Sequence, residues 1–369
     1  MQTILFVLLT TFAFQLNAQQ LENPYYEHLQ KLHEKGKFNG TALVIKNDSV
    51  ILKRAYGVID KDSSALLQTN TMFRIASLSK AFTAVAIMQQ KEQSKLHLDQ
   101  TIDEILSDFP YKGITIKQLL THTSGLPDYL KWMWRNWKPE LKYWDKNRYI
   151  TNGDSLFNVF INRGKPLLFK PGKKWKYSNT GYHILVQILE KTSGLSYKDY
   201  IQKNILVPLG MNSTKFDDPA DICCNYETAK RAYGYLKINK NKSVQNENHF
   251  INPFASSESI LSNLDDLSKW NTGLRTNKLL SDSSIQEITY PHIKMNRFSK
   301  SYYGYGWAVV KTKWNTQINH HSGDWLGFKT YIMRDINQKD CIVLLTNNSL
   351  SNIGLSMIGY KLTEMLNKN

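Results

Sequence analysis

The chain has 369 residues, of which 41% are hydrophobic, and its 47 Lys and Arg against 31 Asp and Glu give a net charge of +16. That hydrophobic content excludes a disordered chain, and the length allows a sizeable core in one large or two interleaved domains. Three cysteines are too few for the disulfide framework of a small secreted domain, and no metal-binding spacing of His and Cys occurs. We therefore expect neither a metal nor a cofactor.

Residues 1–18 have the pattern of a secretory signal peptide, cleaved near Ala18 or Gln19. The apolar stretch from Ile4 to Phe14 is shorter than the roughly 20 residues that a transmembrane helix needs. It departs from the usual signal peptide because no Lys or Arg precedes the apolar run. We expect a protein that is exported to the periplasm or the outside medium, with no stable membrane anchor after cleavage.

Beyond the signal peptide, hydrophobic periodicity predicts strands near both ends of the chain and helices between them. The predicted helices cover residues 24–35, 77–90, 116–122, 179–192, 197–207, 264–274 and 351–366. The predicted strands cover residues 41–46, 50–58, 303–310, 328–333 and 341–346. This order indicates an α/β protein of the α+β type, in which an antiparallel sheet is flanked by helices. We expect residues 19–90 and 250–369 to form the sheet subdomain and residues 91–249 to form an inserted helical lobe.

The most informative segment is Ser77-Leu78-Ser79-Lys80, which an apolar run from Ala81 to Met88 follows. If a helix begins at Ser77, positions i and i+3 share a face, and Lys80 can take the proton of the Ser77 hydroxyl. The first turn of such a helix also presents free backbone N–H groups to a developing oxyanion. These are the parts of a serine acyl-transfer centre.

Two further motifs follow along the chain: Tyr177-Ser178-Asn179, the only Tyr-x-Asn, and His321-Ser322-Gly323, the only His-x-Gly. The three motifs in this order resemble the serine β-lactamase and penicillin-binding-protein superfamily. They resemble in particular its class C β-lactamase-like branch, which also holds D-alanyl-D-alanine peptidases and esterases. Local resemblance extends to residues 119–127 and 323–328. It implies a β-lactamase/transpeptidase-like fold over residues 19–369, with the active site in the cleft between sheet and helical lobe.

The resemblance implies a role for each matching residue. Ser77 attacks the substrate carbonyl, and Lys80 and Tyr177 carry the proton. Asn179 orients the substrate amide or supports Lys80, and the backbone N–H groups of Ser77 and Asp324 are the expected oxyanion hole. The other positions implied for substrate binding are His321, Ser322 and Gly323.

His321 departs from the pattern, because many relatives carry Lys before Thr-Gly at this place. A Lys supplies a fixed positive charge, whereas a histidine is mostly neutral near pH 7. Binding of the carboxylate of a β-lactam or of a D-Ala-D-Ala terminus is therefore expected to be weaker. Asp324 adds a negative charge directly after the glycine.

Each catalytic candidate also has a purely structural interpretation. Ser77 can be a helix N-cap, Lys80 a surface lysine and Tyr177 a packed aromatic residue. Two observations favour a catalytic role for Lys80 and Tyr177. Lys80 precedes an apolar helix face, where burial favours the neutral amine that acts as a base. The basic run 173–176 before Tyr177 makes its phenol easier to ionise.

Half of the net charge lies between Asp128 and Lys176, where 12 Lys and Arg outnumber 4 Asp and Glu. The segment also holds five tryptophans: Trp132, Trp134, Trp137, Trp144 and Trp175. Interleaved basic and aromatic residues can bind nucleic acid or glycans, but an exported protein rarely meets nucleic acid and no such motif is present. The remaining alternatives are a Trp-packed lobe with a solvated basic face, or a surface for anionic cell-envelope polymers.

The cysteines are predicted to be unpaired. Cys341 opens an apolar run that ends at Leu345, which indicates a buried thiol on a strand. Cys223 and Cys224 are adjacent, and adjacent cysteines bridge only with strain.

The sequence therefore predicts a secreted serine hydrolase that forms an acyl-enzyme on Ser77 with a small-molecule or peptide substrate. The substrate class stays open between amide, ester and β-lactam. The chain lacks the Gly-x-Ser-x-Gly of an α/β-hydrolase. The alternative is a sensor module that binds penicillin or peptidoglycan and stays acylated. The rate of deacylation separates these two functions.

Overall fold

The computed structural model describes residues 23–59, 65–136, 153–216, 231–237, 243–245, 260–298, 300–348 and 354–368. The predicted signal peptide lies outside these residues, as do Cys223, Cys224, Trp137 and Trp144. Within the described ranges, no helix is both long enough and apolar enough to cross a membrane.

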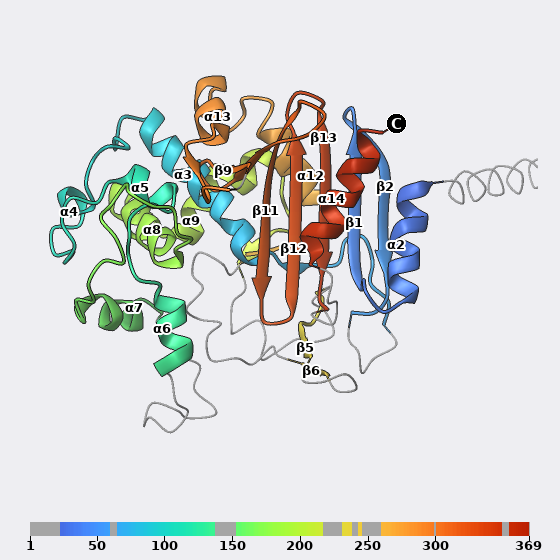
Figure 1. Ribbon diagram of the computed structural model, residues 1–369, viewed down its shortest axis with the longest axis horizontal. Coiled ribbons are helices and arrows are strands. Elements are labelled where there is room, and N and C mark those ends of the chain that lie inside the picture. Colours follow the sequence, from blue (N-terminus) through green and yellow to red (C-terminus); the bar gives the residue numbers. More distant parts are fainter. Residues whose placement is uncertain are drawn as a thin grey trace, which may run out of the picture.

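An antiparallel sheet of eight strands, in the order β2-β1-β13-β12-β11-β10-β9-β8, forms one half of the molecule (Figure 1). Strand β1 pairs with β13, with Gly40 opposite Thr346, so strands from near the two ends of the chain lie side by side in this sheet. The strands are β1 Gly40–Lys46, β2 Ser49–Tyr56, β8 Ile293–Lys294, β9 Ser301–Tyr303, β10 Ala308–Lys311, β11 Gln317–Trp325, β12 Phe328–Asp335 and β13 Asp340–Thr346. The predicted fold class, with strands from both chain ends in one antiparallel sheet, is confirmed.

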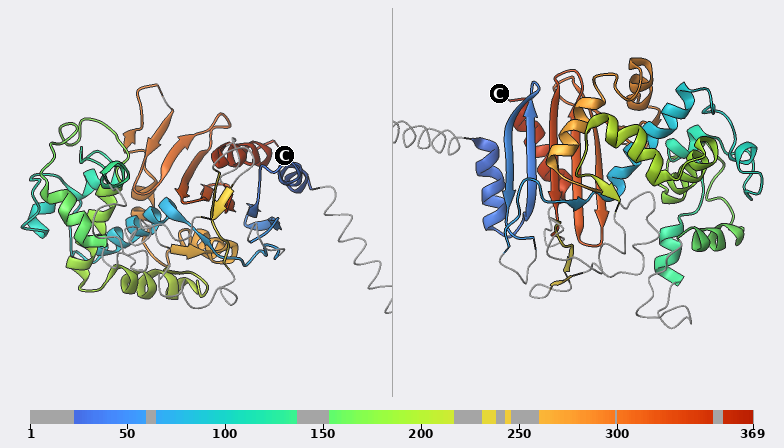
Figure 2. Two further views of the ribbon diagram at one scale, coloured as in Figure 1. Left: turned by 90° about the horizontal axis from the view of Figure 1, so that it is seen from below. Right: turned by 180° about the vertical axis from the view of Figure 1, so that it is seen from behind.

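Successive residues of the central strands face two separate hydrophobic layers, because side chains alternate along a strand. Leu43 packs in the layer that contains α3 (Ser79–Glu92) and α12 (Leu264–Gly273). Its neighbour Val44 packs in the layer that contains α2 (Pro24–Glu34) and α14 (Leu355–Leu366). The view from below in Figure 2 shows the sheet between these two layers.

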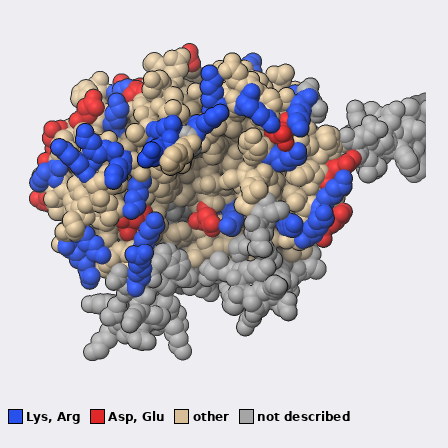
Figure 3. Space-filling view, viewed as in Figure 1, with Lys and Arg blue, Asp and Glu red and all other residues tan. Residues whose placement is uncertain are grey.

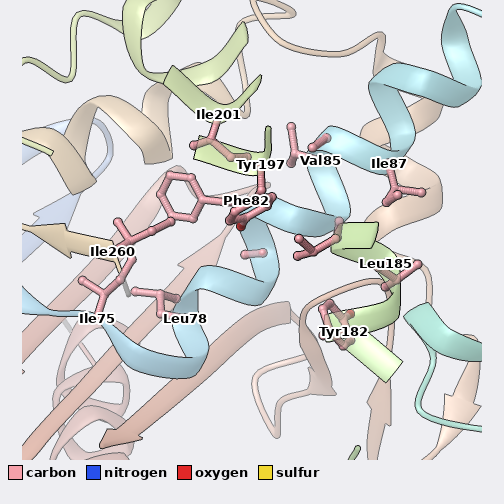
Figure 4. Close-up of a cluster of buried hydrophobic side chains, with 14 of the residues drawn as sticks. Ile75, Leu78, Phe82, Val85, Ile87, Tyr182, Leu185, Tyr197, Ile201 and Ile260 are labelled. Carbon is pink, nitrogen blue, oxygen red and sulfur yellow. The ribbon is translucent and has the colours of Figure 1, made fainter. Parts of the chain in front are cut away.

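Helix α3 is the central element of the core. All its residues from Ser79 to Gln90 are buried, and it packs against the helical lobe as well as near the sheet. Phe82 stacks on Trp270 of α12 with ring centroids 3.9 Å apart, and Figure 4 shows Phe82 among Tyr197, Ile201 and Ile260. Burial of such an aromatic side chain contributes about 1.5–3 kcal/mol. The start of α3 is thereby held rigidly in the interior.

A helical lobe lies at the side of the sheet opposite β2 (Figures 1 and 2). Its helices are α4 Ile102–Ile105, α5 Ile116–Leu120, α6 Tyr129–Asn136, α7 Gly153–Asn162, α8 Asn179–Ser193, α9 Tyr197–Ile201, the π-helical η2 Gln202–Leu206 and α10 Val207–Leu209. All of them fall within residues 91–249. The division of the chain into a sheet subdomain and an insertion at these boundaries stays a prediction.

The remaining elements are short. Helix α13 covers Asp282–Thr289, and a three-stranded sheet contains β3 Phe73–Arg74, β7 Ile260–Ser262 and β4 Lys215–Phe216. Strands β5 Tyr235–Lys237 and β6 Ser243–Gln245 form a hairpin. Strand β3 runs directly into the turn that holds Ser77.

The structure differs from the predicted elements at several places, and the helices α4, α6, α7 and α13 are not among the predicted ones. Residues 303–310 form two strands rather than one, because Gly304–Trp307 separates β9 from β10. Residues 197–207 form α9 and the π-helical segment rather than one regular helix. Strand β11 was not predicted. The predicted buried thiol is confirmed, since Cys341 on β13 is fully buried and unpaired.

Candidate active site

Ser77 lies in a 3-10 turn, η1 (Ala76–Leu78), that directly precedes α3. The predicted helix start at Ser77 is therefore wrong by two residues, since the regular α-helix begins at Ser79. Ala76 has a φ of 50°, in the left-handed region that costs a non-glycine residue of order 1 kcal/mol. The hydroxyl of Ser79 donates to the Ala76 carbonyl at 2.7 Å, which helps to hold this turn.

Lys80 reaches back to Ser77 as the i, i+3 spacing predicts. Its Nζ donates to Ser77 Oγ at 3.1 Å, and the lysine is fully buried. Lys80 Nζ lies 5.2 Å from the ring centroid of Tyr177 and 5.7 Å from that of Tyr182. The amine that can accept the proton of Ser77 is thus surrounded by aromatic rings rather than by solvent.

Tyr177 and Asn179 lie at the start of α8. Ser178 is the N-cap, and its Oγ accepts from the N–H of Gly181 at 3.1 Å. Asp128 fixes Asn179, because its Oδ2 accepts from both the backbone N–H at 3.0 Å and the side-chain amide at 3.1 Å. Sequence reasoning did not single out Asp128, whose only signal was its place directly after the segment 119–127.

Strand β11 carries the third motif past the serine turn. A side chain at Gly323 would meet the Ile75 carbonyl at 2.4 Å and Thr330 Oγ1 at 2.5 Å, so only glycine allows this close approach. The neighbouring strand β10 pairs with β11 only as far as His320, opposite Ala308. From His321 onward this edge of β11 pairs with no other strand of the described chain.

His321 is a neutral, hydrogen-bonded histidine. Burial, together with the nearby Lys80, lowers the pKa of His321 to about 3. Its Nδ1 lies 2.8 Å from the Ser322 carbonyl and therefore donates, so its Nε2 accepts from the Tyr303 hydroxyl at 3.0 Å. Burial also lowers the pKa of the adjacent His320 to about 4. Neither imidazole supplies a positive charge near pH 7.

Asp324 points toward solvent rather than into the core. Its side chain is 71% exposed, and its Oδ2 pairs with Lys329 Nζ at 3.1 Å. The alternation along β11 explains this, since His321 and Gly323 are buried while Ser322 and Asp324 are exposed.

These elements enclose a pocket of about 540 Å³. Six of the predicted residues line it: Ser77, Tyr177, Asn179, His321, Ser322 and Asp324. Figure 3 shows a hollow in the middle of the corresponding face, with Lys and Arg side chains around it. Trp325, from the resembling segment 323–328, also lines the pocket. Further lining residues that no motif indicated include Asp128, Lys131, Met295, Tyr303 and His320. Acidic, basic and aromatic groups thus share one cavity with the candidate nucleophile.

The model of the Beta-lactamase family matches residues 26–353. The chain belongs to this family. It is 32% identical over 333 residues to Penicillin-binding protein 4* of Bacillus subtilis (strain 168), which covers 87% of this chain and 71% of that protein. The assignment makes it a β-lactamase-like serine hydrolase of the penicillin-binding-protein superfamily, as the three motifs implied.

Solved structures of other proteins have the same fold. The penicillin-binding protein from Bacillus halodurans is similar with a TM-score of 0.79 and 25% identity, over 92% of this chain and 99% of that chain. The D-amino acid amidase from Ochrobactrum anthropi SV3, complexed with L-phenylalanine amide, has a TM-score of 0.71 and 22% identity over 90% of each chain. The second likeness concerns the fold alone.

Proposed function

We propose that this member of the Beta-lactamase family is an exported serine hydrolase of the class C β-lactamase-like branch that forms an acyl-enzyme on Ser77. The observation that carries the proposal is the 3.1 Å hydrogen bond between Lys80 Nζ and Ser77 Oγ at the wall of the pocket. Tyr177 and Asn179 line the same pocket. Nucleophile, base and a second proton carrier are thus available to one bound substrate.

In the proposed reaction, Ser77 Oγ attacks the acyl carbon while the neutral Lys80 amine takes the hydroxyl proton. The bond from the acyl carbon to the leaving group then breaks, and Tyr177 relays the proton from Lys80 to the departing nitrogen or oxygen. In the second half, water attacks the acyl carbon and loses a proton to Lys80. The bond from the acyl carbon to Ser77 Oγ then breaks, the proton returns from Lys80 to Ser77 Oγ, and the acid is released. The backbone N–H groups of Ser77 and Asp324 are the proposed oxyanion hole.

The neutral state of His321 favours a substrate without a carboxylate beside the scissile bond. His321 is neutral, with its pKa lowered to about 3, and Asp128 and Asp324 add negative charge to the wall. Lys131 lines the pocket from α6, and Lys329 is paired with Asp324. We propose uncharged esters or amides as better substrates than penicillins, because a penicillin carboxylate finds no fixed cation at position 321.

The test is a substrate panel on the purified full chain, with Ser77→Ala as the control. Short-chain esters, D-amino acid amides, a D-Ala-D-Ala peptide and penicillins are compared by kcat/KM, and a fluorophosphonate is followed by intact mass. One adduct on the wild type and none on Ser77→Ala is expected. Equal labelling of both proteins would remove Ser77 from the mechanism. A penicillin adduct that persists for hours without turnover of any substrate would favour the sensor function instead.

We also propose that the helical lobe presents its exposed lysines to anionic polymers of the cell envelope. Lys165, Lys170, Lys173, Lys174 and Lys176 are all exposed on the segment that leads to Tyr177. Arg163 and Lys165 lie 4.7 and 6.0 Å from the centroid of the Trp132 ring. Trp132 therefore makes cation–π contacts with two basic residues of this lobe. Cations beside the pocket mouth would concentrate a polyanionic substrate carrier there.

A further inference from the structure

His122 holds the chain on both sides of Tyr177. Its carbonyl accepts from the N–H of Lys176 at 2.9 Å, and its Nδ1 accepts from the N–H of Ser178 at 3.2 Å. Its ring also lies against the ring of Tyr177, with centroids 4.3 Å apart. One residue thus contacts the residue before Tyr177, the residue after it and the phenol itself.

The backbone of His122 is strained in the position that makes these contacts possible. Its φ is 57°, just after the end of α5, and its N–H donates to the Leu119 carbonyl at 3.2 Å. A left-handed conformation costs a non-glycine residue of order 1 kcal/mol and persists only where surrounding structure determines it. Glycine or asparagine would adopt this φ more easily than histidine. The backbone conformation alone therefore does not account for a histidine at this position, and the contacts of its side chain do.

The imidazole is held in one chemical state. It is 1% exposed, and its ring centroid lies 5.0 Å from that of Tyr182 and 4.6 Å from that of Tyr303. Burial, with Lys80 and His321 nearby, keeps the pKa of His122 well below its usual value. Since Nδ1 accepts from a backbone N–H, the single ring proton is on Nε2. His122 stays an acceptor for Ser178 at neutral pH.

We propose that His122 is a positioning residue that fixes the Tyr177 phenol against Lys80. The proposal rests on the role in proton transfer proposed above for Tyr177. His122 is not among the residues that line the pocket, and it acts through the backbone on either side of Tyr177 and through ring packing. Loss of its acceptor would leave the Ser178 N–H unpaired and let Tyr177 shift, and a misplacement of about 1 Å can lower a rate about a hundredfold.

The test compares variants that keep or remove the acceptor. His122→Phe keeps a ring but removes Nδ1, whereas His122→Asn keeps an acceptor near Nδ1 and suits the left-handed backbone. Turnover of an activated ester is measured per active site, with sites counted by fluorophosphonate titration. His183→Phe is the matched control, because His183 is equally buried in the same lobe, packs on Phe157 at 3.9 Å and does not line the pocket.

We expect His122→Phe to lower kcat per site about a hundredfold with little change in KM, and His122→Asn to recover most of that loss. In a Tyr177→Phe background, His122→Phe should lower kcat by less than about threefold, since the residue that it positions is gone. His183→Phe should keep the wild-type kcat per site. If His122→Phe does not fold, His122→Gln replaces it, because its amide lies one bond further out and misplaces the acceptor.

Equal losses from His122→Phe in both backgrounds, or a wild-type kcat per site, would overturn the positioning role while leaving Tyr177 in the mechanism. Full turnover by Tyr177→Phe alone is a different result. It would remove Tyr177 from the proposed reaction, and the role of His122 with it.

Discussion

At the scale of single residues, the neutral state of His321 is the observation on which the proposed preference for uncharged substrates rests. Burial lowers the pKa of His321 to about 3, and its two hydrogen bonds, to Ser322 and Tyr303, use both ring nitrogens. An anionic substrate therefore meets an uncharged ring at this place, with both nitrogens already hydrogen-bonded, rather than a cation.

Replacement of His321 by Lys should shift the preference toward anionic β-lactams. A permanent cation in the pocket wall adds an electrostatic partner for the penicillin carboxylate but none for an uncharged ester. The ratio of kcat/KM for penicillin to that for a short ester should rise by about tenfold, which corresponds to about 1.4 kcal/mol. His321→Gln is the control, since it stays neutral and should leave the ratio near that of the wild type. An unchanged ratio in His321→Lys would contradict this account of specificity.

At the scale of elements, the strands and helices with regular hydrophobic periods were predictable. Eight elements lie close to their predicted residues, because each buries a stripe or a face of apolar side chains. They are the helices α2, α3, α8 and α12 and the strands β1, β2, β12 and β13. Strand β11 was not predictable in this way. From Asn319 to Asp324 it carries polar residues and glycine, and tertiary pairing with β10 and β12 determines it.

In the candidate site, too, local sequence spacing predicted some contacts, and the fold alone creates the others. Ser77 and Lys80 are close in sequence, so helical spacing predicted their contact. Asp128, Tyr303 and His122 meet the motifs only through the fold, and none of them has a spacing that points to Tyr177 or His321. Contacts over long sequence separations are the part that one sequence does not specify by local pattern.

The close passage of β11 over the serine turn leads to a prediction about Gly323. Gly323→Ala should lower the free energy of unfolding by about 1–3 kcal/mol and reduce turnover, because the new methyl group meets the Ile75 carbonyl and Thr330. Gly354→Ala is the matched control, since a methyl group there meets nothing within 4 Å. Denaturant unfolding and ester turnover measure both effects. Wild-type stability and turnover in Gly323→Ala would show that the turn and the strand can separate without loss.

At the scale of the whole molecule, the net charge of +16 directs a polyanion to one surface only if the cations are concentrated on that surface. Exposed lysines lie on the segment that leads to Tyr177, and Figure 3 shows further Lys and Arg around the hollow. Cations are also exposed at the far end of the molecule, where Lys35 and Lys37 follow α2 (Figure 1). Comparing variants of the two sets of lysines shows whether a polyanion binds at the helical lobe or responds only to the net charge of the protein.

The pair Lys173→Glu and Lys174→Glu should weaken binding to an immobilised anionic polymer more than the pair Lys35→Glu and Lys37→Glu. Both double variants change the net charge equally, so a difference in the salt concentration of elution reports position alone. We expect the wild type to elute last, the α2 pair close behind it and the lobe pair clearly earlier, since screening weakens contacts between exposed charges. Ester turnover at low salt checks that both variants keep the active site intact. Equal shifts of the two pairs would show that the polymer responds to net charge and that the lobe is a solvated basic face.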